Sequence, residues 1–120
     1  MIKNYKDLNV WKKSMDLAVA VYRLTKKLPT EEVYILSDQM RRAAVSVPSN
    51  IAEGHAGVSS KKFVQFLYIA RGSLSELETQ SEIGNRLGYF TDEETAKIAQ
   101  LCSDVGKMLN GLITSLSTKQ

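Results

Sequence analysis

Apolar residues recur at three- and four-residue steps along almost the whole chain, and this spacing predicts helices rather than strands. The pattern is clearest in the second predicted helix, over about residues 31–54. Its apolar stripe consists of Val33, Leu36, Met40, Ala43, Val47 and Ile51. A polar stripe lies beside it at the same spacing: Gln39, Arg42, Ser46, Asn50 and Glu53. A solvent-exposed helix face does not need such a register, so we interpret the polar stripe as a partly buried network.

Three further helices are predicted by the same periodicity, over about residues 8–28, 60–87 and 92–116. Four helices joined by three short connections predict an all-α fold, an antiparallel up-down-up-down four-helix bundle. At 120 residues the chain fits a single domain, residues 1–120, that buries roughly two-thirds of its unfolded surface.

Start and stop signals separate the predicted helices. They are Pro29 and Thr30 between the first two helices, Gly54 after the second, Ser59 or Ser60 before the third, and Gly88 with a Thr91–Glu94 capping box before the fourth. Pro48 lies inside the second helix, where proline costs about 3 kcal/mol. Because the apolar spacing continues from Val47 to Ile51, we expect a kink there rather than a break.

The first predicted helix has more apolar surface than one face of a bundle requires. Its two apolar stripes merge into an arc of roughly 220°, whereas a core-facing stripe needs only a little over about 100°. The excess predicts a second contact surface, most simply with another copy of the chain. The alternative is a monomer in which this helix is the most buried of the four.

Helices two and three should be antiparallel across a connection at about residues 54–57, so that residues whose numbers sum to about 115 lie level. This register brings Arg42 near Ser73 and Glu76, and Gln39 near Glu76 and Gln80, and predicts a buried Arg42–Glu76 pair. The complete structural network is Gln39, Arg42, Ser46, Asn50, Glu53, Ser73, Glu76 and Gln80. A catalytic Glu53–Glu76 pair, or a metal site with His55, is the alternative. Di-metal bundles carry Glu-x-x-His on two helices, and this chain has a single histidine. We therefore expect a structural role, with no catalytic residue, metal or cofactor.

The composition shows that charge is unevenly distributed along the chain, and it indicates a cellular compartment. The formal net charge is +3, with 16 Lys and Arg against 13 Asp and Glu, and the excess lies within the first thirty residues. No apolar run approaches the ~20 residues that span a bilayer, and the N-terminus lacks the apolar core of a signal peptide. The single Cys102 allows no intramolecular disulfide. A cytoplasmic protein without membrane contact is predicted.

Two groups of cations are candidates for nucleic-acid binding. Lys12, Arg23, Lys26 and Lys27 occupy the polar arc of helix one, and Lys61 and Lys62 stand in the first turn of helix three. Cations in a first turn oppose the helix dipole, which hints at an external anion. No aromatic residue is interleaved with them, so contacts with the RNA or DNA backbone are predicted rather than base stacking. A solvated charged face is the alternative.

Three segments resemble one protein family. They are DLNVWKKSMDLAVAVYRLT, LSDQMRRAAVSVPSNIAEG and FVQFLYIARGSLSELETQ, and they are similar to the four-helix-bundle proteins of 23S rRNA intervening sequences. The resemblance implies a ring-like homopentamer and no known catalytic residues. The accessory variability determinant of diversity-generating retroelements is similar, which implies nucleic acid or a reverse transcriptase as a partner. Ile35 departs from the family pattern, where a small residue is expected, and this puts the start of helix two in doubt.

The resulting prediction is a non-enzymatic, oligomeric helical bundle that binds RNA or DNA through phosphate contacts. The alternative is a protein-binding assembly or accessory factor, for example to a reverse transcriptase, without direct nucleic-acid contact.

Overall fold

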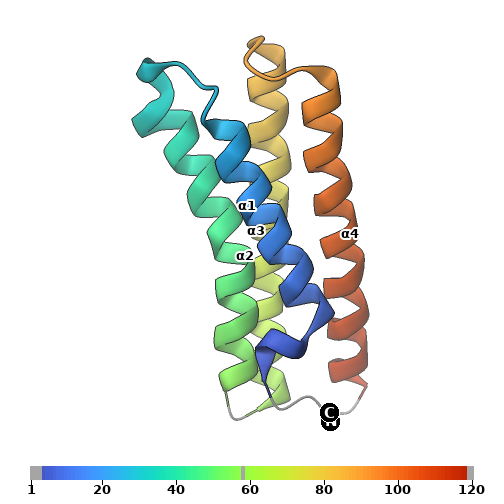
Figure 1. Cartoon of the computed structure of the whole chain (residues 1–120). Coiled ribbons are helices and arrows are strands. Elements are labelled where there is room, and N and C mark those ends of the chain that lie inside the picture. The colour runs from blue at the N-terminus through green and yellow to red at the C-terminus, as the bar shows by residue number, and fades with distance from the viewer. Residues whose placement is uncertain (1–3, 58, 119–120) are drawn as a thin grey trace.

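The computed structural model describes residues 4–57 and 59–118 and shows four long α-helices, with no strand in that part of the chain. They are α1 (Asn9–Thr25), α2 (Asp38–Ala56), α3 (Ser60–Arg86) and α4 (Asp92–Ser117). α1 and α3 run in one direction and α2 and α4 in the other (Figure 1). The predicted all-α, up-down-up-down four-helix bundle is confirmed, and it is elongated, at 46 × 23 × 20 Å.

Each helix packs along two neighbours, and one apolar core runs through the bundle. α2 contacts α1 and α3, and α4 also contacts α1 and α3, so that α1 and α3 lie diagonally opposite each other (Figure 1). The largest fully buried apolar side chains are Leu17, Met40, Ile51, Leu67, Leu77 and Leu109. They occupy the inner stripe of every helix, as the periodicity predicts.

The corner between α3 and α4 follows the sequence signals. Gly88 takes a positive φ of 82°, and the N–H of Tyr89 donates to the carbonyl of Gly84 over 2.9 Å, which completes a Schellman-type end. The predicted Thr91–Glu94 capping box is present. Phe90 is buried, with its ring directly against Gly84, where a Cβ atom would collide with it.

The start of α2 differs from the prediction. Thr30 does not cap an α-helix; a 3₁₀ turn, η2 (Thr30–Glu32), is followed by a π-helical turn, η3 (Val33–Ser37), and α2 begins only at Asp38. The physical reason is a lack of packing partners, because this end of the segment leans away from the bundle (Figure 1). Val33 is exposed although it belongs to the predicted apolar stripe, and Tyr34 is 90% exposed.

The end of α2 also differs, because Gly54 lies inside the helix instead of ending it. Gly54 is buried where α3 approaches closely: a Cβ atom there would lie 2.8 Å from the Cβ of Phe66 and 2.8 Å from Cδ1 of Phe63. The glycine therefore serves helix packing rather than a turn. α2 continues unbroken through the buried Pro48, which confirms that the helix does not break there. Ser59 caps α3 by accepting a hydrogen bond from the N–H of Lys62.

Candidate nucleic-acid interface

Two cations on the outer face of α1 and a third at its C-cap, Lys26, are exposed, whereas Lys13 of the same helix is paired with Asp104 of α4. The inner face is occupied by buried Val10, Ser14, Leu17, Ala18, Val21 and Thr25, so the intervening positions Lys12, Arg23 and Lys26 are exposed. None of these three forms an ion pair within the described residues. Lys12 and Lys26 are fourteen residues apart, or ~21 Å along the helix axis. The three side chains thus form a line of free positive charge along α1, which we call the α1 cation line.

Lys27 is different, because it is held by a carboxylate. Its Nζ atom lies 2.6 Å from Oε1 of Glu94, the residue that closes the capping box of α4. The Lys27 ammonium and the backbone N–H of Thr91 lower the pKa of the Glu94 carboxyl group. Lys27 therefore joins α1 to α4 and has less charge to offer an external anion than the cations of the α1 cation line.

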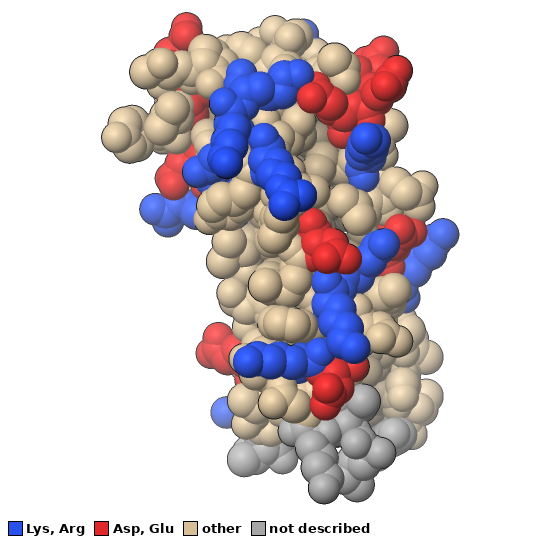
Figure 2. Space-filling view, viewed as in Figure 1, with Lys and Arg blue, Asp and Glu red and all other residues tan. Residues whose placement is uncertain are grey.

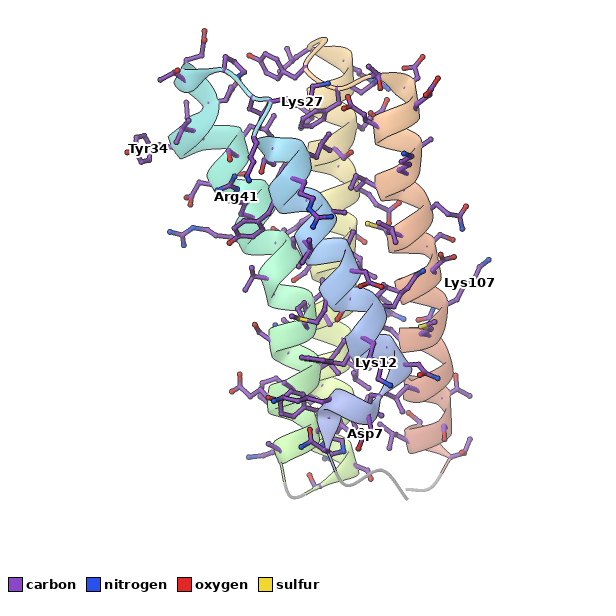
Figure 3. The ribbon with its side chains drawn as sticks, viewed as in Figure 1. Asp7, Lys12, Lys27, Tyr34, Arg41 and Lys107 are labelled. Atoms are coloured by element: carbon purple, nitrogen blue, oxygen red, sulfur yellow. The ribbon has the colours of Figure 1, made fainter. Side chains whose placement is uncertain are left out.

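The bundle does not bring Lys61 and Lys62 to the same place as Lys26 and Lys27. Both lysines are exposed in the first turn of α3, at the end of the bundle where α1 begins, whereas Lys27 lies at the opposite end (Figures 1 and 3). α3 spans ~40 Å between these ends. The six predicted cations thus form a line of three along α1, the ion-paired Lys27 beyond its end, and one separate pair at the start of α3 (Figure 2 shows the face that carries α1).

The outer surface of α1 also contains apolar side chains that the bundle leaves open. Met15, Val19 and Tyr22 follow at helical spacing, Val45 of α2 is their neighbour, and all four are 38–44% exposed. One hollow is lined by Val19 and Tyr22, together with Arg23 and Lys26, and the next by Tyr22 and Val45. Met15 lies one helical turn before Val19, and we call the surface of these four apolar residues the α1–α2 patch. The excess apolar surface predicted for helix one is therefore present in the folded chain.

Arg41 anchors the α1–α2 patch, and sequence reasoning did not identify it. Its guanidinium lies 4.6 Å from the centre of the Tyr22 ring, and its Nε donates to Oγ1 of Thr25 over 2.9 Å. A cation is favourable at the end of α1, where carbonyl groups lack helical partners. The interaction depends on how α1 and α2 cross, and no local sequence signal identifies such a crossing.

One half of the predicted polar network lies between α2 and α3. The hydroxyl groups of Ser46 and Ser73 are 2.8 Å apart, and Nδ2 of Asn50 donates to Oγ of Ser46 over 2.9 Å. Ser73 is buried, so this contact fixes the register of the two helices. The level pairs sum to about 119 rather than 115, because α2 continues past Gly54.

The other half of the network faces solvent, and the predicted buried Arg42–Glu76 pair is wrong. The Arg42 side chain is 80% exposed and its Nε lies 3.0 Å from Oδ2 of Asp38, one turn earlier on α2. A groove of about 300 Å³, here named the α2–α3 groove, lies between the two helices, with Arg42 on its α2 side and Glu76 on its α3 side. The residues that line it are Gln39, Arg42, Ala43, Ser46, Ser73, Glu76 and Gln80. Glu53 is exposed on α2. Hydration of a guanidinium and a carboxylate outweighs their pairing unless the site is closed to water.

Comparison with known proteins gives the family. The family model described as 23S rRNA-intervening sequence protein matches residues 6–111. The chain belongs to this family. A solved structure of unknown function from the S23 ribosomal protein family of Bacteroides thetaiotaomicron is 30% identical, with a TM-score of 0.81 over 87% of this chain and 97% of that one. None of the curated proteins compared with the chain matches it.

The two remaining side chains with reactive groups, Cys102 and His55, pack against other residues of the bundle. Cys102 is buried, and desolvation raises the pKa of its thiol to about 12. The His55 ring packs edge-on against Phe63, with ring centres 5.7 Å apart. Residues 4–57 and 59–118 contain no group of three or more His, Cys, Asp and Glu side chains placed to hold a metal. No helix in this range combines the length and apolarity needed to cross a membrane.

Proposed function

We propose that this protein binds the phosphate backbone of RNA or DNA through α1, as a non-enzymatic homo-oligomer. The observation that carries the proposal is the α1 cation line: Lys12, Arg23 and Lys26 are exposed without ion-pair partners among the described residues. A duplex carries one negative charge per ~1.7 Å of its axis, so a line of cations ~21 Å long faces several phosphates. The family description, which names an rRNA intervening sequence, favours the same class of ligand.

Self-association would bring several copies of this weak binding site into one assembly. Three cations in one chain provide few phosphate contacts, whereas several copies in a ring present the same line repeatedly to one polyanion. Large apolar side chains that are left exposed on α3, Tyr68, Ile69 and Ile83, supply apolar surface for such contacts away from the α1 cation line, and the family resemblance favours five copies. Light scattering should then give a mass near five times the 13.4 kDa chain. A monomer at micromolar concentration would remove the assembly from the proposal.

The binding experiment compares two variants that lose the same charge from different faces. Lys12→Gln with Lys26→Gln removes two cations from α1, and Arg86→Gln with Lys107→Gln removes two from α3 and α4. Fluorescence anisotropy with single-stranded RNA and duplex DNA should show weaker binding for the α1 variant only. Each lost phosphate contact reduces the slope of log K against log salt by about one. Equal affinity of the two variants, or no binding at low salt, contradicts the proposal.

Lys61 and Lys62 test how far the site extends. The pair lies at the opposite end of the bundle from Lys27, so it contributes only if the nucleic acid follows the long axis of the molecule. Lys61→Gln with Lys62→Gln should then deepen the loss caused by the α1 variant. An unchanged affinity would confine the site to α1.

A second candidate function is protein binding, and one observation favours it. Val33, Tyr34 and Ile35 of η3 are all exposed, and Tyr34 points away from the bundle (Figure 3). A solvent-exposed apolar cluster of this kind suits an accessory role toward another protein, such as a reverse transcriptase. Tyr34→Ser should leave nucleic-acid affinity unchanged under the main proposal. If Tyr34→Ser abolishes complex formation with a co-purifying protein while the α1 variant does not, the accessory role is favoured.

A further inference from the structure

We infer that a hollow between α3 and α4 binds an aliphatic polyamine, a hydrocarbon chain that carries an ammonium group at each end. The hollow, here named the α3–α4 hollow, has a volume of about 530 Å³, against about 300 Å³ for the α2–α3 groove. It is lined by residues of α3 between Glu78 and Arg86 and by Thr95 and Ala99 of α4. None of these residues belongs to the α1 cation line, so the inference is independent of nucleic-acid binding.

Two short side chains leave the space between the helices open. α3 and α4 are antiparallel (Figure 1), and residues whose numbers sum to about 180 lie level, as the hydrogen bond from Arg71 to Oδ1 of Asn110 over 3.0 Å shows. Ser81 is therefore level with Ala99, and both line the hollow. Neither side chain is long enough to fill the gap in front of it.

The wall of the α3–α4 hollow contains an unsatisfied polar group. Ser81 is only 2% exposed, and its Oγ atom has no hydrogen-bond partner among the described residues. A buried hydroxyl group normally has such a partner. Because Ser81 lines the hollow, a ligand bound there can supply the missing hydrogen bond.

The other polar groups of the hollow are mostly hydrogen-bond acceptors. The hydroxyl groups of Thr79 and Thr95 each donate to a backbone carbonyl one turn earlier, over 2.9 Å in both cases, which leaves only their lone pairs for a ligand. Glu78 and Glu82 are one helical turn apart, ~6 Å along the axis, and Arg86, the one cation of the lining, is held by Glu82 over 3.2 Å. An ammonium group, with three N–H donors and no acceptor, suits such a site.

The charge around the α3–α4 hollow also favours a cation. Glu78 forms no ion pair within residues 4–57 and 59–118. Burial, and after it the negative charge of Glu78, raises the pKa of the Cys102 thiol to about 12, which places this carboxylate close to α4. Arg86 and Lys97 are the only cations of residues 76–104, and Lys97 faces α1, where it lines a hollow with Arg23. The free charge near Ser81 is therefore negative.

The apolar part of the lining favours a chain of methylene groups over a metal ion. Ile83 and Ala99 contribute apolar surface beside the polar groups. The described part of the chain holds no group of three or more His, Cys, Asp and Glu side chains that could bind a metal. A polyamine suits both features, because its methylene groups pack on Ile83 and Ala99 while its ammonium groups reach Ser81 Oγ and the carboxylate of Glu78.

Isothermal titration calorimetry with spermidine, at low salt and without nucleic acid, tests this site. The wild-type protein should bind about one spermidine per chain, with an affinity that falls as salt rises. Ser81→Ala and Glu78→Gln should each weaken binding about three- to tenfold, as expected for the loss of one polar contact. Glu53→Gln is the matched control: it removes an exposed carboxylate of α2 that also lacks an ion pair among the described residues, and it should leave the affinity unchanged.

Ser81→Ala also separates binding from folding. Without ligand, removal of an unsatisfied buried hydroxyl group should leave the melting temperature unchanged or raise it. Spermidine should raise the melting temperature of the wild type, because it binds only the folded state, and should raise that of Ser81→Ala less. A lower melting temperature of ligand-free Ser81→Ala would mean that the hydroxyl group already has a structural partner, and this would remove the main support for the site.

Three further outcomes would overturn the inference. The first is no saturable binding of spermidine by the wild type. The second is equal affinity of Ser81→Ala, Glu78→Gln and Glu53→Gln, which would show attraction to surface charge without a defined site. The third is equally tight binding of Nα-acetyl-lysine amide, which would mean that the hollow accepts a lysine side chain of another protein. Lys12→Gln with Lys26→Gln should bind spermidine like the wild type, so failure of the proposed function is distinguished from failure of this site.

Discussion

α1 and α3 are the diagonal helices of one bundle, yet their outer faces differ in kind. Both bury an apolar stripe and leave large apolar side chains in solvent, Val19 on α1 and Ile69 on α3. Among the described residues, α1 has a single acid, Asp16, beside cations that form no ion pair, Lys12 and Arg23. α3 instead carries acids and cations without ion pairs together in that part of the chain: Glu76 and Glu78 with Lys61, Lys62 and Arg71. The difference teaches that the inner stripes determine the fold, while the charges around the outer apolar residues determine what each face can bind.

The largest expected effect is a difference in the free energy of unfolding between substitutions on the inner and on the outer face of α1. Leu17 is fully buried, so Leu17→Ala should lower the free energy of unfolding by about 2–5 kcal/mol. Val19→Ala should change it by less than about 0.5 kcal/mol, since Val19 contributes little to the core. Urea denaturation of both variants at several protein concentrations would reveal any contribution from association as a dependence on concentration. Similar losses for the two would mean that the outer face supports the fold itself.

A smaller effect makes the same separation on α3. Gly84→Ala should destabilise the protein by about 1–3 kcal/mol, because a Cβ atom there collides with the buried ring of Phe90. Gly72→Ala is the matched control, with open space around the new methyl group. A gain of about 0.5–1 kcal/mol is expected from the higher helix propensity of alanine. Thermal unfolding of both would reveal the opposite signs, and a loss at Gly72 would instead show that its backbone is in contact with another surface.

The smallest effect distinguishes Lys27 from the free cations of α1. Glu94→Gln keeps a capping side chain and removes the attraction of Lys27, which should cost about 0.5 kcal/mol for a partly exposed pair. The pKa of Glu94 is lowered from its ordinary 4.5, so its contribution is present above that value and is lost as the pH falls through the folded-state pKa. The difference between wild type and Glu94→Gln should therefore be seen at pH 7 and vanish in acid. A constant difference across this range would contradict the ion pair.

Local sequence signals predict the corner at Gly88 and Thr91 well because their causes are local. A left-handed glycine and a capping box involve only residues a few positions apart. The start of α2 could not be predicted in this way. Its π-helical turn follows from where the segment leaves the bundle, and Thr30 is a good cap by composition alone. The prediction that Gly54 ends α2 fails for a related reason. The glycine is needed where Phe66 of α3 approaches closely, and such a tertiary contact leaves no local signal in the sequence.

The candidate site also contains some features that the sequence predicts and others that depend on how the helices pack. Periodicity places Lys12, Arg23 and Lys26 on the outer face of α1, and the folded chain has them there. The register between α2 and α3 brings Ser46 to Ser73, whereas the exposure of Arg42 depends on the width of the α2–α3 groove. The ion pair of Lys27 with Glu94 joins residues 67 positions apart, which no sequence spacing indicates.

The central claim, that nucleic acid contacts the outer face of α1, is tested most directly by footprinting lysine side chains. The wild-type protein is acetylated with and without single-stranded RNA at low salt, and modification at each lysine is measured by mass spectrometry. Lys12 and Lys26 should be protected by the RNA, and Lys107, which projects from α4 (Figure 3), should react equally in both samples. High salt should remove the protection, because phosphate contacts weaken as salt rises. Unchanged reactivity of Lys12 and Lys26, or protection confined to Lys107, would contradict the account.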